Sequence, residues 1–212
     1  MLFSSTMTAT RDKMPMLLLC MLMLPVASGT ASAGAPVPLP TLERVTVLPE
    51  PKVIPDFELT DQSGLPRTLA SLRGRPLLIF FGFTHCPDVC PAALFKLKLL
   101  HDINGGALKG AQLVMISVDG ERDTPAVMKK YLASLSPDFI GLTGNPRSVG
   151  NIAARFSAVA FKGEPGTDGN YSFFHSEQVF LLDKGGRLRA SFFDASLESM
   201  ATVTGLVLNE KG

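Results

Sequence analysis

Residues 77–100 read LLIFFGFTHCPDVCPAALFKLKLL and contain the strongest fold signal in the chain. The first seven residues form a continuous apolar run, which is typical of a central strand buried on both faces. Residues 91–100 have helical character, and Pro91 is tolerated in the first turn of a helix. Cys86 and Cys90 lie where the predicted strand leads into the predicted helix. We therefore expect both sulfur atoms to face one cleft at the helix N-terminus.

The segments on either side predict alternating strands and helices. We expect strands at 55–59 and 112–118, helices at 123–134 and 146–156, a hairpin at 179–182 and 188–193, and a closing helix at 196–208. Residues 162–173 are expected to be a polar, glycine-containing insertion before the hairpin. This order predicts an α/β domain with three layers, α/β/α, around a central mixed sheet. A cysteine pair between a central strand and a helix is the thioredoxin-like arrangement.

The start of the chain has the features of a targeting signal. Arg11 and Lys13 precede an apolar segment at 16–26, and the small residues Ala-Ser-Ala follow at 31–33. The apolar segment is shorter than the roughly 20 residues that span a bilayer. Residues 1–33 are therefore predicted to be a signal peptide or an N-terminal membrane anchor. The location predicted for the chain is the periplasm or another extracytoplasmic space.

Beyond this leader, we predict a Pro-rich linker at 34–54 and a single domain at 55–212. The formal net charge is +1, which gives no reason to expect a nucleic-acid partner. Contact with a membrane is expected only through an uncleaved leader.

Cys86 and Cys90 are the two cysteines outside the leader, which contains Cys20. A close pair in an exported protein is a disulfide, a metal site or a redox pair. Residues i and i+4 share one helix face, and a helix N-terminus lowers the pKa of nearby thiols. Soft thiolates favour Cu(I), and imidazole is also a copper ligand.

A third ligand would come from one of three histidines. His85 adjoins Cys86 and is poorly placed to complete the same chelate, and we expect it to face away. His101 ends the first predicted helix and is expected on the solvated surface. His175 precedes the predicted hairpin, in a loop that lies against the cysteine turn in thioredoxin-like folds. It is the best candidate, although a buried histidine without metal is the alternative.

Three motifs in order resemble the Sco/SenC family of copper-delivery proteins, which are linked to cytochrome c oxidase assembly. They are FGFTHCPDVCP at 81–91, ISVDGERDTP at 116–125 and HSEQVFLLD at 175–183. The resemblance implies that Cys86, Cys90 and His175 bind Cu(I) or Cu(II). It implies as partner the copper-receiving subunit of cytochrome c oxidase, with a reductant or another copper chaperone as a further partner.

Three positions of the second and third motifs carry further expectations. Asp119 matches an aspartate common in the family and is expected to support the fold or a partner surface. The family usually has proline where this chain has Gly120, which we expect to change only the rigidity of the turn. It often has aspartate where this chain has Phe174, which removes a carboxylate that could tune the metal ligands.

Two classes of function remain open from the sequence. A metallochaperone would bind copper through Cys86, Cys90 and His175 and pass it on. A thiol-disulfide oxidoreductase would use the same cysteines as a redox pair to reduce cysteines of a copper-site partner. A thiol peroxidase is disfavoured by the spacing of the cysteines and the absence of tryptophan, and a structural disulfide in so small a loop would stabilise little. His175 separates the first two classes, because a dithiol reductase does not need it.

Overall fold

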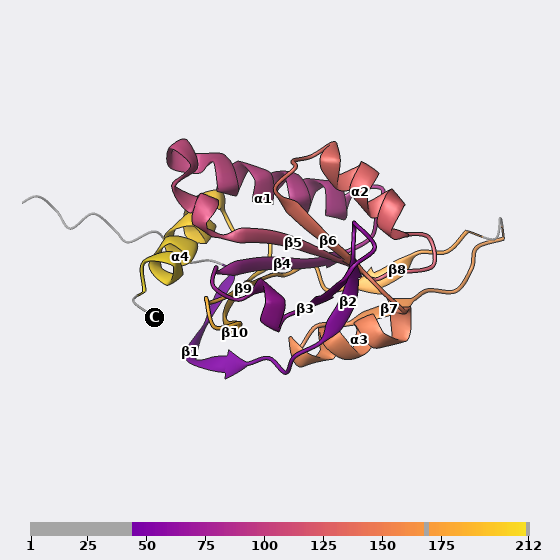
Figure 1. Cartoon of the computed structure of the whole chain (residues 1–212). Helices are drawn as coiled ribbons and strands as arrows, with labels where there is room; N and C mark the ends of the chain where they lie inside the picture. Colours follow the sequence, from indigo (N-terminus) through magenta and orange to yellow (C-terminus); the bar gives the residue numbers. More distant parts are fainter. Residues whose placement is uncertain (1–43, 168–169, 211–212) are drawn as a thin grey trace, which may run out of the picture. The chain divides into compact units, whose positions relative to one another are not determined.

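The computed structural model describes residues 44–167 and 170–210, which belong to one compact unit (Figure 1). The predicted leader at 1–33 and the first ten residues of the predicted linker lie outside the described residues. Within the described part of the chain, no helix combines the length and apolarity needed to cross a membrane.

A mixed sheet of eight strands forms the centre of the described domain, in the order β1-β10-β9-β4-β5-β6-β2-β3. Strands β4, β5 and β6 are parallel, and the other neighbours pair antiparallel. The strands are β1 (Val45–Val53), β2 (Glu58–Asp61), β3 (Pro66–Thr68), β4 (Leu77–Gly82), β5 (Gln112–Ser117), β6 (Phe139–Thr143), β9 (Val179–Leu182) and β10 (Arg187–Phe192). The predicted thioredoxin-like α/β fold is confirmed.

Strand β4 lies in the interior of the domain, and every one of its residues is buried. It pairs in parallel with β5, from Leu77 opposite Gln112 to Gly82 opposite Ser117. Parallel strands present their carboxyl ends at one edge of the sheet, where ligand sites of α/β proteins form. The cysteine loop after β4 and the loop after β5 therefore lie next to each other.

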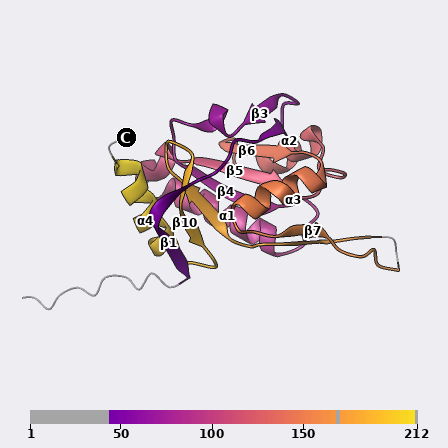
Figure 2. The same ribbon diagram turned by 90° about the horizontal axis from the view of Figure 1, so that it is seen from below.

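Among the described residues, four α-helices cover the sheet: α1 (Val89–Gly106), α2 (Pro125–Ala133), α3 (Pro146–Arg155) and α4 (Leu197–Asn209). Figures 1 and 2 show α1 and α2 on one face and α3 on the other, which gives the three layers. Thr124 caps α2 and Ser196 caps α4. The side chain of each accepts a hydrogen bond from a backbone amide in the first turn of its helix. Helix α1 begins two residues before the predicted start at 91 and extends beyond residue 100.

The predicted linker is wrong for residues 45–53, which form β1 and pair with β10. Val45 and Leu48 pack against the core, which gives this edge strand a reason to dock. The pairing is irregular between Val47 and Lys52, the interval that contains Pro49 and Pro51. Proline is accommodated at edges and bulges of a sheet because it donates no backbone hydrogen bond. The proline residues led to the prediction of a linker where the chain forms an edge strand.

The expected insertion at 162–173 is part of a hairpin whose strands the sequence analysis missed. Strand β7 (Ala160–Lys162) pairs antiparallel with β8 (Phe173–His175) in a sheet of their own. The 3-10 helices η1 (Ala70–Leu72) and η2 (Ala107–Gly110) complete the described elements. The hairpin matters for function because His175 is its last paired residue.

Candidate metal centre

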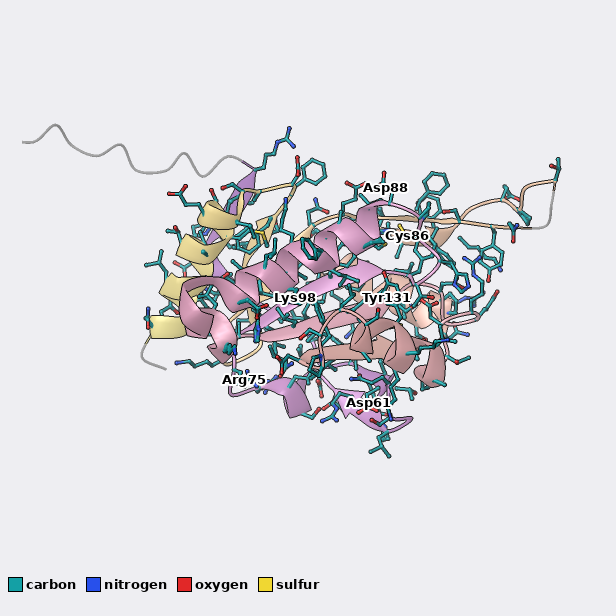
Figure 3. All side chains as sticks on the ribbon, turned by 90° about the horizontal axis from the view of Figure 1, so that it is seen from above. Asp61, Arg75, Cys86, Asp88, Lys98 and Tyr131 are labelled. Carbon is teal, nitrogen blue, oxygen red and sulfur yellow. The ribbon has the colours of Figure 1, made fainter. Side chains whose placement is uncertain are left out.

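Both cysteines lie at the N-terminal end of α1, as Figure 3 shows for Cys86. Cys86 is in the loop after β4, and Cys90 is the second residue of the helix. The side chain of Cys90 packs against the end of β4, where a Cβ added to Gly82 would lie 3.1 Å from Cys90 Sγ. Cys86 is 7% exposed and Cys90 is not exposed at all. Both thiols are free, as a metal site or a redox pair requires.

The electrostatics of Cys90 differ from the expectation that a helix end lowers the pKa of a nearby thiol. The amide of Cys90, in the first turn of the helix, donates a hydrogen bond to Cys86 Sγ at 3.4 Å. Burial raises the pKa of Cys90 well above its ordinary value, and the neighbouring Cys86 adds to the rise. The expectation is wrong for Cys90, because loss of hydration outweighs the helix end there.

The raised pKa of Cys90 predicts how the stability of the metal-free, reduced protein depends on pH. A group whose pKa is higher in the folded state stabilises the fold below its unfolded-state pKa of about 8.5 and loses that contribution as pH rises. Between pH 9 and 10, we expect Cys90 to remove about 1.4 kcal/mol of unfolding free energy per pH unit. Urea unfolding at pH 8, 9 and 10 measures this.

The matched control is Cys90→Ala, which lacks the buried thiol. It is expected to be less stable at every pH because of the lost packing, but to lose less stability between pH 9 and 10. Equal slopes in the two proteins would show that Cys90 does not ionise with a raised pKa.

His175 reaches the cysteines from β8, with Nε2 3.5 Å from Cys90 Sγ. Its ring packs edge-on against Phe80 and Phe83, with centroids 5.9 and 5.8 Å away. Nδ1 lies 3.1 Å from the carbonyl oxygen of Ser176. A carbonyl only accepts, so Nδ1 carries the proton and the lone pair of Nε2 faces the cysteine.

The ligand atoms of Cys86, Cys90 and His175 all lie within 4.8 Å of one another. Sulfur and nitrogen ligands sit about 2.0–2.3 Å from a transition-metal ion, so ligands sharing one ion are roughly 3.5–4 Å apart. A small inward movement therefore suffices to hold one ion. The donor set, two soft thiolates and an imidazole, fits copper.

The other two histidines lie apart from this centre. His85 is exposed, and its Nδ1 lies 3.1 Å from Thr84 Oγ1 and 3.6 Å from Asp123 Oδ1. Its side chain faces the acidic residues after β5, as expected for a histidine turned away from the cysteines. His101 is only 5% exposed, so the prediction that it is solvated is wrong. It lies inside α1, which extends beyond the predicted helix end.

Asp123 is a supporting residue whose role the sequence analysis missed. The helix that follows is capped by Thr124, so Asp123 is free for another role. Asp123 is fully buried and accepts hydrogen bonds from Ser117 Oγ, from the Thr84 amide and from the Thr84 hydroxyl. It therefore ties the cysteine loop to the end of β5. Its position in the loop, several residues beyond the second buried strand, gave no local signal of this role.

A second group of ligand-type atoms, from His85, Asp119 and Asp123, is also close together. Its carboxylates already have protein partners. Asp119 pairs with Arg122 and accepts from the Tyr171 hydroxyl, while Asp123 holds the cysteine loop. Asp119 is fully buried, so it supports the fold and cannot form the partner surface that was the alternative. These hydrogen bonds and the ion pair explain why the two carboxylates lie close together, without a metal ion.

The two departures from the family pattern have structural explanations. Phe174 is exposed and stacks on Phe161, with ring centroids 5.1 Å apart. In place of a carboxylate, a backbone carbonyl accepts the hydrogen bond from the second ring nitrogen of His175. A Cβ added to Gly120 would lie 1.8 Å from the carbonyl oxygen of Gly144. Glycine at 120 therefore permits a close approach of two loops, which is more than a change in turn rigidity.

Comparisons with known proteins agree on one family. The family model described as SCO1/SenC matches residues 46–205. A SCO2-like protein of Rickettsia prowazekii is 39% identical over 138 residues, which are 65% of this chain and 67% of the relative. Bradyrhizobium japonicum ScoI, solved with copper bound, is 38% identical with a TM-score of 0.65, over 74% of this chain and 99% of that one. Yeast Sco1, solved with copper bound, is 27% identical with a TM-score of 0.67, over 76% of this chain and 91% of the yeast chain.

Proposed function

The chain belongs to the SCO1/SenC family, and on that premise we propose that it binds copper and delivers it to a copper site of cytochrome c oxidase. Copper is the cargo in this proposal. Cys86, Cys90 and His175 hold it, and the receiving oxidase subunit is the partner.

One observation carries the proposal: ligand atoms from two distant parts of the chain converge on one point. Cys90 and His175 are 85 residues apart in sequence, yet Sγ and Nε2 lie 3.5 Å apart. The imidazole has the tautomer that a metal ligand needs, with its second nitrogen bonded to a carbonyl. A dithiol that only exchanges disulfides has no use for this histidine.

The unequal burial of the three ligands supports release of the ion from one side. Cys90 is fully buried, Cys86 is 7% exposed and His175 is half-buried. Ligands of a receiving protein can approach only from the side of Cys86 and His175. These two ligands would exchange first, and Cys90 last.

The test is copper titration of the reduced His175→Ala variant. We expect its affinity for Cu(II) to fall about 100-fold and its affinity for Cu(I) to fall about tenfold, because the thiolates alone hold the softer ion better. Competition with a chromophoric chelator measures both. The matched control is His85→Ala, which removes an exposed histidine next to Cys86 and should change either affinity less than about twofold. Unchanged binding by His175→Ala would refute the three-ligand site.

The second candidate function is reduction of a disulfide in the copper-site partner. The observation in its favour is that both thiols are free and adjacent. A thiolate would attack the partner disulfide, and the second thiolate would release the reduced partner while Cys86 and Cys90 become a disulfide. The raised pKa of Cys90 weighs against rapid attack, since the best attacking thiols have a pKa near ambient pH. Reduction of the partner by His175→Ala at the full rate would favour this candidate.

We propose an extracytoplasmic location, where the leader either has been removed or tethers the protein. The support is the charged start, the apolar segment at 16–26 and the Ala-Ser-Ala sequence at 31–33. N-terminal sequencing of the protein from a cell-envelope fraction tests this. A sequence beginning near residue 34 shows cleavage, and recovery of the intact chain in the cytosol would contradict the location.

A further inference from the structure

The hairpin that carries His175 is not part of the main sheet. Its strands β7 and β8 pair only with each other among the described strands. A two-stranded hairpin alone is marginally stable in water. At the open end of the hairpin, the Ser176 amide donates a hydrogen bond to the Val159 carbonyl, so this bond also joins the hairpin to itself. Contacts between the hairpin and the rest of the domain therefore help to set the position of His175 over the cysteines.

Tyr171, four residues before His175, makes the densest set of these contacts. Its ring is flanked by two cations: the Arg122 guanidinium carbon is 4.0 Å from the ring centroid, and Lys162 Nζ is 3.7 Å away. Its hydroxyl lies 3.2 Å from Asp119 Oδ1 and 3.1 Å from Glu121 Oε2. Arg122, Asp119 and Glu121 all belong to the loop between β5 and α2. Tyr171 thus connects the hairpin to the loop beside the cysteines.

The loop offers a firm attachment point for this tyrosine. Asp119 is fully buried, and its carboxylate forms an ion pair with Arg122. A second ion pair, between Glu121 and Lys162 at 2.7 Å, crosses from the loop to β7. Cation–π contacts contribute more when the cation is partly desolvated, and the side chain of Arg122 is only 23% exposed. Both the ring and the hydroxyl of Tyr171 are therefore held.

A series of aromatic contacts leads from Tyr171 to His175, the proposed copper ligand. Tyr171 packs edge-on against Phe173, with centroids 5.9 Å apart, and Phe173 packs against Phe83 at 5.8 Å. Phe83 contacts the ring of His175, and the Arg122 guanidinium carbon lies 5.9 Å from the Phe83 centroid. A shift of Tyr171 would therefore move the aromatic residues on which the His175 ring rests.

We propose that Tyr171 is a positioning residue that holds His175 at the cysteine pair by fastening the β7–β8 hairpin to the loop after β5. The proposal rests on the proposed function, because positioning matters only if His175 binds copper. Tyr171 does not touch the ion. Its loss is expected to weaken the contribution of His175 while the two thiolates remain in place.

The experiment measures loss of Cu(II) from the purified, reduced chain to excess EDTA by stopped-flow absorbance. Tyr171→Leu is expected to speed the loss about tenfold, because both the cation–π contacts and the hydrogen bond that the hydroxyl donates to the carboxylates disappear. Tyr171→Phe keeps the ring between its cations and is expected to speed the loss only about threefold. The matched control is Tyr131→Phe, which removes a buried hydroxyl without a hydrogen-bond partner and should stay within about twofold of the unsubstituted chain.

A double-mutant cycle separates positioning from general destabilisation. If Tyr171 acts through His175, then Tyr171→Leu has no further effect in the His175→Ala background. Equal acceleration in both backgrounds, or none in the unsubstituted chain, overturns the proposal while leaving the copper site intact. If His175→Ala itself leaves the rate unchanged, the three-ligand site fails, and the role of Tyr171 fails with it.

Discussion

Oxidation of Cys86 and Cys90 to a disulfide is expected to reduce the Cu(I) affinity of the chain by at least about 1000-fold. The two thiolates pass two electrons to the added oxidant and form one S–S bond, so two anionic ligands become neutral disulfide sulfurs. Structural metal sites with four ligands are worth about 10–16 kcal/mol, so a single ligand is worth roughly 2.5–4 kcal/mol. Losing two of three ligands therefore removes most of the binding free energy.

Serine variants separate the ligand role of each cysteine from the redox change. Cys86→Ser and Cys90→Ser are each expected to lower Cu(I) affinity about 100-fold, because a hydroxyl is a harder and weaker ligand than a thiolate. Competition with a chromophoric Cu(I) chelator, with and without reductant, measures every case. Cys20→Ser is the matched control and should bind like the unsubstituted chain in both redox states. Equal affinity of the reduced and oxidised chains would refute the cysteine pair as the copper site.

Replacing Asp123 by alanine is expected to lower the free energy of unfolding by about 3 kcal/mol. Asp123 is fully buried, and its carboxylate accepts hydrogen bonds from Ser117 and Thr84. Each buried donor left without a partner costs about 1–3 kcal/mol. Urea unfolding of the reduced protein measures the loss.

The same substitution is expected to weaken copper binding, because Thr84 lies in the cysteine loop, just before Cys86. Asp123→Asn keeps the shape and one acceptor oxygen, so it should lose less stability. Asp88→Ala is the matched control: it removes an exposed carboxylate from the same loop and should stay within about 0.5 kcal/mol. An Asp123→Ala protein as stable as the Asp88→Ala protein would contradict the anchoring role.

Local patterns predicted much of the fold. The apolar run at 77–83 identified the central strand, because a strand buried on both faces admits few polar residues. Thr124 followed by Pro125 marked the start of α2, because a cap and an early proline act through adjacent backbone groups. Residues 45–53 were wrongly predicted to be a linker, because proline content does not indicate whether a segment can pair with the edge of a sheet. That partner, β10, comes more than 130 residues later.

The sequence by itself determined the cysteine pair at a helix N-terminus, since the spacing of Cys86 and Cys90 and the start of α1 are local properties. It also singled out His175, although only through the expected fold. The tertiary structure decided the tautomer of His175, the raised pKa of Cys90 and the fastening of the hairpin by Tyr171. Each of these depends on desolvation or on contacts between segments far apart in the chain, which no local pattern of residues contains.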